Sequence, residues 1–167
     1  MAAYATVDEL AQVATDGWEE LAQFASRNPG LTGHLLQQRF NGESPNEDQA
    51  LIAAADAALV QLQDLLESVS RYADSYLNQR YRALVPLAPE HYENTGLPFA
   101  VAAIALGRLY GLRKSDEMRK AIAEQDSYLR DLAAGRASLN YQQPSTPDEP
   151  GRMTVSARPS AFPWDKY

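Results

Sequence analysis

The stretch ADAALVQLQDLLESVSRYADSYLNQRY, residues 55–81, decides the fold of this chain. Apolar residues recur in it at alternating four- and three-residue spacing, at Ala55, Leu59, Leu62, Leu66, Val69, Ala73 and Tyr76. That spacing places them on one face of an α-helix, and no Gly or Pro interrupts it. Asn46 precedes the pattern as a candidate N-cap, so we expect a helix that ends near Arg80. At roughly 1.5 Å per residue it would be about 50 Å long, which favours a helix that spans the core of a bundle.

Helical patterns also precede this stretch. A capping box begins at Thr6, and the apolar spacing after it predicts one amphipathic helix to about Ala25, bent near Gly17. Residues 28–30, Asn-Pro-Gly, are expected to end that helix. A short helix is expected over residues 32–40.

The chain after the long helix predicts two more helices. Pro86 and Pro89 enforce an extended connection. The run LPFAVAAIALGRLYG, residues 97–111, is apolar on every side over much of its length, which predicts a helix at the buried centre of the domain. Ser115 is a candidate cap for the last helix, and Gly135 is a natural left-handed stop.

We therefore expect an all-α fold, a compact bundle of four to five helices with an extended C-terminal arm. The bundle is predicted over residues 1–135 and the arm over residues 136–167, which hold five of the ten prolines. The end of the arm, RPSAFPWDKY, combines prolines with large apolar side chains. Such a segment either folds back on its own domain or docks on another protein. The candidate partner-binding residues are Arg158, Phe162, Trp164 and Tyr167.

The charge of the chain is acidic and uneven. Residues 1–135 carry 11 Lys+Arg and 19 Asp+Glu, a net charge of −8, whereas residues 136–167 carry 4 and 3, a net charge of +1. A body this acidic offers few cations to phosphate backbones, so we expect no DNA binding by counterion release. The same acidity suits a duct through which DNA slides. There is no signal-peptide pattern, and no apolar run reaches the roughly 18 residues of a membrane span, so a soluble, non-exported protein is expected.

The sequence holds few groups for catalysis or metal binding. It has no Cys, which fits folding in a reducing cytosol, and its two histidines, His34 and His91, lack metal-ligand spacing. It contains no phosphate-binding loop and no nucleophile elbow. We expect His34 to be a surface or half-buried residue of a helix and His91 to be solvated in a Pro-rich loop. Glu19 and Glu20 are expected on a solvated helix face. The prediction is therefore no catalytic, cofactor-binding or metal-binding residue, no cofactor and no enzymatic activity.

The order of several motifs resembles one known family. The helix that ends in ADSYLNQRY, residues 73–81, is followed by RALVPLAP, by the apolar helix that ends in RLY, and by YLRDLAAGRASLN, residues 128–140. This order resembles the Mu-type phage head–tail joining family of head-completion adaptors, over about residues 50–140 and the YATVDEL start at Tyr4. Residues 16–45 match the family pattern poorly, and the stretch after Asn140 is longer than the family leads us to expect.

The resemblance implies a virion structural protein of the head–tail junction, assembled in the host cytoplasm. Copies would bind beneath the portal protein after DNA packaging and form a ring, twelvefold in such phages. The ring would lengthen the DNA channel, surround DNA without sequence-specific binding, and present a surface to a tail terminator or other tail-end protein. The resemblance also implies that the C-terminal arm grips the portal or a neighbouring copy. No membrane is involved.

Tyrosines and arginines at the end of the long helix are candidates for the ring interface, because both residue types are favoured at interfaces. The candidates are Tyr76, Arg80, Tyr81 and Arg82. The alternatives are that the tyrosines pack at the core edge and that the arginines form bridges within the bundle. The alternative function is a helical interaction module outside the virion, such as a packaging or scaffold factor. A small helical enzyme is disfavoured by the missing chemistry.

Overall fold

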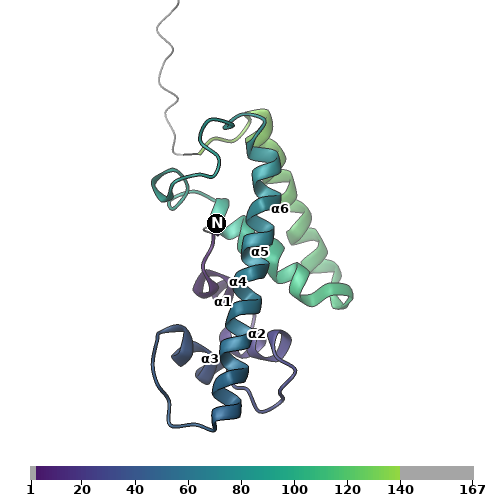
Figure 1. Cartoon of the computed structure of the whole chain (residues 1–167). Coiled ribbons are helices and arrows are strands. Elements are labelled where there is room, and N and C mark those ends of the chain that lie inside the picture. The colour runs from purple at the N-terminus through teal and green to yellow at the C-terminus, as the bar shows by residue number, and fades with distance from the viewer. Residues whose placement is uncertain (1–2, 140–167) are drawn as a thin grey trace, which may run out of the picture.

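The computed structural model describes residues 3–139, and within them the chain forms α-helices and short 3₁₀ segments but no β-strand. The predicted all-α class is confirmed. Helix α4 is the spine of the body, and the other helices lie along it (Figure 1). The α-helices are α1 (Val7–Val13), α2 (Gly17–Ala25), α3 (Gly33–Phe40), α4 (Gln49–Leu77), α5 (Leu97–Tyr110) and α6 (Asp116–Ala134). The 3₁₀ segments are η1 (Pro89–His91) and η2 (Gly111–Arg113).

Helix α4 follows the predicted pattern, with small differences at its ends. Asp48, not Asn46, caps the first turn, because its Oδ1 accepts a hydrogen bond from the Ala50 N–H at 3.1 Å. The helix ends at Leu77, before Arg80, and its 29 residues span about 43 Å. The predicted apolar positions are buried, apart from the last, which is half-buried; the buried ones are Ala55, Leu59, Leu62, Leu66, Val69 and Ala73.

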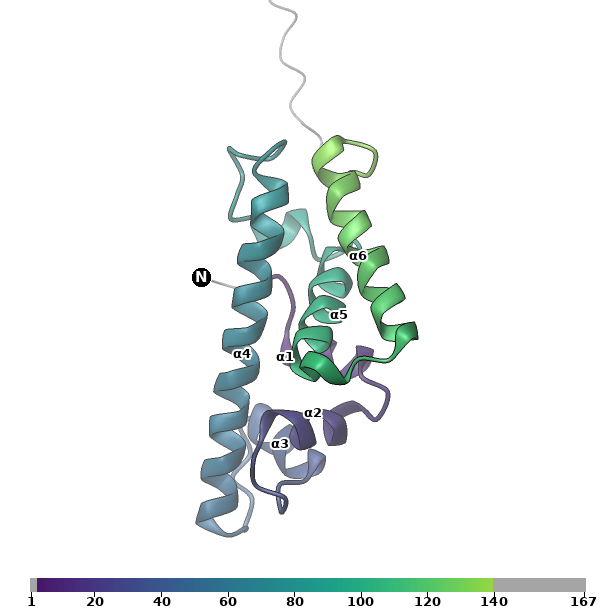
Figure 2. The same cartoon turned by 90° about the vertical axis from the view of Figure 1, so that its right-hand side faces the viewer.

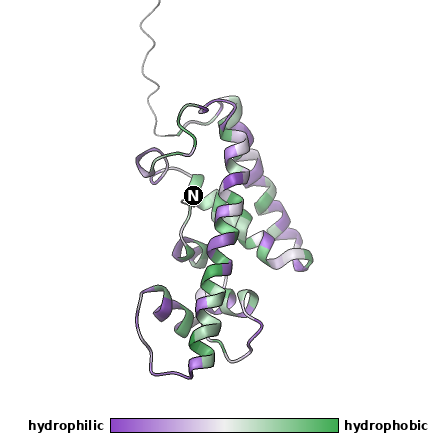
Figure 3. Cartoon of the chain, in the orientation of Figure 1, coloured by the Kyte–Doolittle hydropathy of each residue, from purple (hydrophilic) through white to green (hydrophobic). Residues whose placement is uncertain are grey.

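The other helices cover two halves of α4 (Figure 2). Helices α2 and α3 contact each other and the first half of α4, whereas α5 and α6 contact its second half. Helix α1 lies between these groups and packs on α5. Figure 3 shows hydrophobic and hydrophilic residues interleaved along α4, as expected for a helix with one buried stripe. The buried apolar side chains join into a single core cluster.

The N-terminal segment forms two helices where the sequence predicted one bent helix. The capping box at Thr6 is present, with the Thr6 side chain accepting from the Glu9 N–H. The chain then leaves the helix at Ala14, whose ψ of 141° is extended, and re-enters at Gly17 with a φ of +59°. A φ in this range is accessible to glycine at little cost, so Gly17 makes a break and not a bend. This break brings the number of α-helices in the described residues to six.

Helix α5 is the buried centre, as predicted. Its residues from Leu97 to Gly107 are buried except for Phe99, and Pro98 lies in its first turn. Gly107 allows α6 to approach closely, because a Cβ at this position would fall within 2.9 Å of Ile122 Cγ1. The close packing of α6 on α5 at this point depends on the absence of a side chain at Gly107.

Helix α6 begins and ends where the sequence indicates. The Ser115 Oγ accepts a hydrogen bond from the Met118 N–H at 3.1 Å, and Gly135 ends the helix in the left-handed conformation at a φ of +75°. The core continues past this stop, because Leu139 is buried. Tyr81 Oη accepts a hydrogen bond from the Leu139 N–H at 3.4 Å, so the ends of α6 and α4 are joined at one pole of the body.

Candidate interaction surfaces

The aspartate of the ADSYL motif is buried and holds the N-terminal segment in place. Asp74 Oδ1 accepts a short hydrogen bond from the Tyr4 hydroxyl, and that hydroxyl oxygen accepts another from the Leu87 N–H at 3.0 Å. The Tyr4 N–H donates to Ser70 Oγ at 2.9 Å. The Tyr4 ring also makes an edge contact with Tyr92, with centroids 5.0 Å apart. This Tyr4–Asp74 cluster ties three distant segments of sequence together.

The burial of Asp74 makes its contribution to the stability of the fold depend on pH. Desolvation raises the pKa of Asp74, and the hydrogen bond from Tyr4 opposes that rise in part. A raised pKa means that the folded state binds the Asp74 proton more tightly than the unfolded chain does. This contribution to stability is therefore complete below about pH 4, the value of an unfolded Asp, and is lost as the pH rises through the folded pKa.

We expect an Asp74→Asn variant to change this pH dependence. The amide keeps an oxygen to accept from Tyr4 but does not titrate. The free energy of unfolding of the wild type should therefore fall relative to that of the variant as the pH rises from about 4 to 7. Urea unfolding at several pH values measures this difference. If the difference in unfolding free energy between the two proteins stays constant with pH, or changes in favour of the wild type as the pH rises, the raised pKa of Asp74 is contradicted.

The four predicted ring-interface residues differ in their exposure. Tyr81 is only 7 % exposed and packs in the core of its own chain, where its hydroxyl accepts from Leu139. Arg80 is exposed and lies over the Tyr81 ring, with Cζ 5.6 Å from its centroid. Arg82 is exposed and Tyr76 is half-buried. Three of the four thus present surface at the end of α4, and their part in a ring contact stays a prediction.

A second aromatic cluster joins α4 to α5 and α6. The Tyr72 and Tyr76 hydroxyls lie 2.9 Å apart, and the Tyr72 hydroxyl donates to Asp126 Oδ1 at 3.2 Å. Arg108 stacks over the Tyr72 ring, with Cζ 5.0 Å from its centroid. The hydrogen bond to Tyr76 is the main reason why the pKa of Tyr72 is raised, followed by burial. These contacts support the core-edge alternative for the tyrosines.

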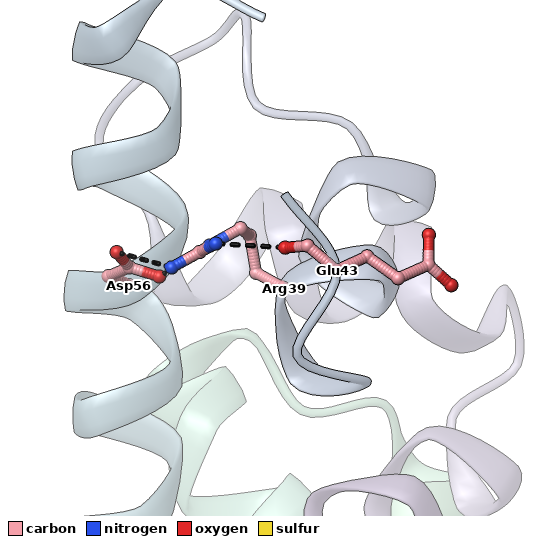
Figure 4. Close-up of polar contacts among 3 residues, drawn as sticks. All are labelled: Arg39, Glu43 and Asp56. Atoms are coloured by element: carbon pink, nitrogen blue, oxygen red, sulfur yellow. Dashed lines mark hydrogen bonds and ion pairs between the residues drawn. The ribbon is translucent and has the colours of Figure 1, made fainter. Parts of the chain in front are cut away.

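An ion pair fixes the loop between α3 and α4. Arg39 donates to both carboxylate oxygens of Asp56, at 2.9 and 3.1 Å, and to the Glu43 carbonyl oxygen at 2.8 Å (Figure 4). The hydrogen bond to Asp56 raises the pKa of Arg39. A two-bonded guanidinium–carboxylate pair has a defined geometry, so it orients α3 on α4. Sequence reasoning did not find this pair, because its members are 17 residues apart and nothing local marks them.

The prediction that Glu19 and Glu20 form a solvated face is wrong for Glu20. Its side chain is only 4 % exposed, accepts a short hydrogen bond from the Tyr110 hydroxyl, and also accepts from the Asp16 N–H at 3.0 Å. Burial, and then the contact with Glu20, raises the pKa of Tyr110 to about 12. Glu19 is exposed, yet its Oε2 accepts from the Gly33 N–H at 2.6 Å. Both carboxylates therefore satisfy donors at the ends of neighbouring helices.

The described residues contain no group of three or more His, Asp or Glu side chains placed to hold a metal ion. His34 is exposed on α3, as expected, whereas His91 is half-buried in η1 and not fully solvated. Across residues 3–139, no helix combines the length and apolar character needed to cross a bilayer. The candidate partner-binding residues Arg158, Phe162, Trp164 and Tyr167 lie outside the described residues. Their role stays a prediction.

The fold and these surfaces define an all-α body held together by side-chain pairs between distant segments. Residues 4–157 match the family described as Bacteriophage Mu, Gp36. The chain therefore belongs to this family of bacteriophage proteins, which confirms the Mu-type phage origin predicted from the motifs. No curated protein and no solved structure matches the chain.

Proposed function

We propose that this protein joins phage heads to tails as a connector. Family membership over residues 4–157 supports a phage role. The observation that carries the connector role is the joining of α4 and α6 at one pole through Tyr81 and Leu139. Residues 140–167, which make up most of the predicted arm, follow Leu139 in the chain. A packed body followed by a segment that carries Phe162 and Trp164 suits a protein that anchors on one partner and offers its remaining surface to another.

The mechanism is assembly and not catalysis. Copies bind beneath the portal after packaging, form a ring, lengthen the DNA channel and present a surface for the tail. The arm supplies the anchor: Phe162 and Trp164 carry large apolar surfaces, and Pro159 and Pro163 lower the entropy lost when such a segment binds. Repetition around a ring multiplies a modest affinity by avidity. The acidic body leaves DNA free to slide, because it repels the phosphate backbone.

The test is binding to the purified portal of the same phage, measured by co-sedimentation and electron microscopy. The full chain should bind as a ring, and a chain ending before Pro159 should lose most of that binding while its helical circular dichroism is unchanged. Absence of binding by the full chain would overturn the proposal. Equal binding by the shortened chain would show that the arm is not the anchor. If the protein is found in immature heads but not in finished virions, the alternative role of a packaging or scaffold factor is favoured.

The acidic body also predicts the behaviour of the free protein toward DNA. Residues 1–135 carry a net charge of −8, so few cations are available for counterion release. The free protein should not retard duplex DNA in a mobility-shift assay at about 0.15 M salt. A salt-sensitive shift at micromolar protein would contradict this prediction.

A further inference from the structure

A turn rich in basic residues joins α5 to α6, and its cations are exposed except for Lys114, which is half-buried. Leu112 in η2 is 100 % exposed, and Arg113, Lys114 and Lys120 lie close to it in sequence. Arg119 pairs with Asp116 at 3.3 Å, but the ion pairs within residues 3–139 do not include Arg113, Lys114 or Lys120. We define the basic turn as Leu112, Arg113, Lys114 and Lys120. Residues 112–120 carry four cations and two carboxylates, Asp116 and Glu117, a net charge of +2 beside an exposed apolar side chain in a body of net charge −8.

A hollow of the opposite character lies at the other end of α5. It has a volume of about 360 Å³, and its lining residues are Glu9, Gln12, Val13, Glu93, Thr95, Pro98 and Phe99. Val13, Pro98 and Phe99 form its apolar part, and Phe99 is 54 % exposed although it lies on the most buried helix. Glu9 and Glu93 supply negative charge, and we call this site the acidic hollow.

The carboxylates of Glu9 and Glu93 both act on Tyr92. The pKa of Tyr92 is raised first by burial and then by the charges of Glu93 and Glu9. Glu9 accepts hydrogen bonds from the Thr6 N–H and hydroxyl, at 2.6 and 3.0 Å, which fixes its position. No ion pair within the described residues neutralises either carboxylate. A partner that brings cations would therefore be attracted to this site.

The basic turn and the acidic hollow cannot meet within one molecule. Phe99 lies in the first turn of α5, and Leu112 lies just beyond its end, 13 residues later. At roughly 1.5 Å per residue this separation is about 20 Å. The two surfaces lie at opposite ends of α5, so each can contact a different neighbouring copy. A contact between unlike surfaces of identical chains is head-to-tail, and it closes into a ring when the rotation between copies allows it.

We propose that the basic turn of one copy docks into the acidic hollow of the next, with Leu112 against Val13, Pro98 and Phe99. Arg113 and Lys114 then lie near Glu93 and Glu9 of the neighbour. This inference rests on the proposed function in one respect, namely that the copies form a ring. It assigns the ring contact to the two ends of α5, a site distinct from Tyr76, Arg80 and Arg82.

Crosslinking in the cysteine-free chain tests the contact. Gln12→Cys places a thiol in the lining of the acidic hollow without removing its apolar or charged residues, and Glu117→Cys places one beside the basic turn, at an exposed position in the first turn of α6, without removing Leu112. A chain with both changes, treated with a short bis-maleimide, should give a ladder of dimers, trimers and longer products. The matched control is Glu117→Cys with Val60→Cys, since Val60 is 56 % exposed on α4 and outside both sites. A ladder no stronger than that of the control would overturn the proposal.

Two further measurements distinguish this contact from chance collision. Mixing a chain that carries only Gln12→Cys with one that carries only Glu117→Cys should give dimers and nothing longer. In the doubly substituted chain, Arg113→Glu with Lys114→Glu should weaken the ladder about tenfold, and Glu93→Lys added to these should restore most of it. A ladder that is insensitive to charge reversal would also overturn the proposal.

The crosslinking is carried out on the free chain at high concentration and on the chain bound to portal. A chain that binds the portal but gives no ladder in either state overturns this contact and leaves the connector role intact. A ladder from a chain that does not bind the portal supports the contact and overturns the connector role.

Discussion

A Gly33→Ala variant should lose about 3 kcal/mol of unfolding free energy, the upper end for overpacking in a closely packed site. Gly33 is the first residue of α3, and a Cβ there would lie 2.6 Å from Glu19 Cα and from the Trp18 carbonyl carbon. These are backbone atoms, so relief requires α3 to move away from α2. That movement would break the hydrogen bond from the Gly33 N–H to Glu19 and separate the Trp18 and Phe40 rings, now 5.2 Å apart.

Gly30→Ala is the matched control. A Cβ at Gly30 meets the end of the Leu51 side chain at 3.2 Å, which can rotate away, and the Asn28 side chain at 3.4 Å. Its effect should stay within about 0.5 kcal/mol, as is usual for surface substitutions. Urea unfolding of both variants measures the comparison. Equal stabilities would show that α2 and α3 are less closely packed than the structure indicates.

The helices that carry regular local signals were predicted well from sequence. Helix α4 has an unbroken apolar stripe whose period matches its buried face, and α5 is apolar on every side and is buried from Leu97 to Gly107 except at Phe99. Ser115 and Gly135 mark the ends of α6 by capping chemistry that depends only on neighbouring residues. The one helix expected over residues 7–25 was predicted less well. The backbone at Ala14 turns extended, and apolar spacing alone does not reveal such a break.

The side-chain pairs that hold the body together were not predictable in the same way. Tyr4 and Asp74 are 70 residues apart, and Tyr110 and Glu20 are 90 apart, so only the assembled fold brings them together. The motif ADSYL resembled a family signature, but the sequence did not show that Asp74 is buried. Tyr81 had the residue type of an interface and is instead packed inside. Residue type alone does not separate a tyrosine that faces a partner from one that fills a core edge.

The two sites at the ends of α5 show the same limit. The cations near Leu112 are visible in the sequence, but their exposure around an apolar tip depends on the turn between α5 and α6. The acidic hollow combines residues of α1 with residues 93–99, which no sequence window contains together. The unlike charges at the two ends of α5 depend on the packed structure. They suggest which surfaces of neighbouring copies meet, and residue composition does not supply this.

A Tyr4→Phe variant should also be strongly destabilised, by about 3 kcal/mol, because one hydroxyl serves two buried groups. Without it, the Asp74 carboxyl group and the Leu87 N–H both lose a hydrogen-bond partner at a buried site. A hydrogen bond to a charged group contributes about 1.5–3 kcal/mol, and a buried group left without a partner adds its own desolvation cost. For a body of this size the melting temperature should fall by roughly 10 °C.

Tyr76→Phe is the control for the loss of a tyrosine hydroxyl. Its hydroxyl makes one neutral hydrogen bond, to Tyr72, at a half-buried position where water can replace it. The expected cost is therefore below about 1 kcal/mol. A double-mutant cycle of Tyr4→Phe with Asp74→Ala, which removes the acceptor, isolates the pairwise energy of the two side chains, and this energy should exceed about 1 kcal/mol. If Tyr4→Phe and Tyr76→Phe melt at the same temperature, the Tyr4–Asp74 cluster does not fasten the N-terminal segment to α4, and that segment must be held by the packing of α1 on α5 alone.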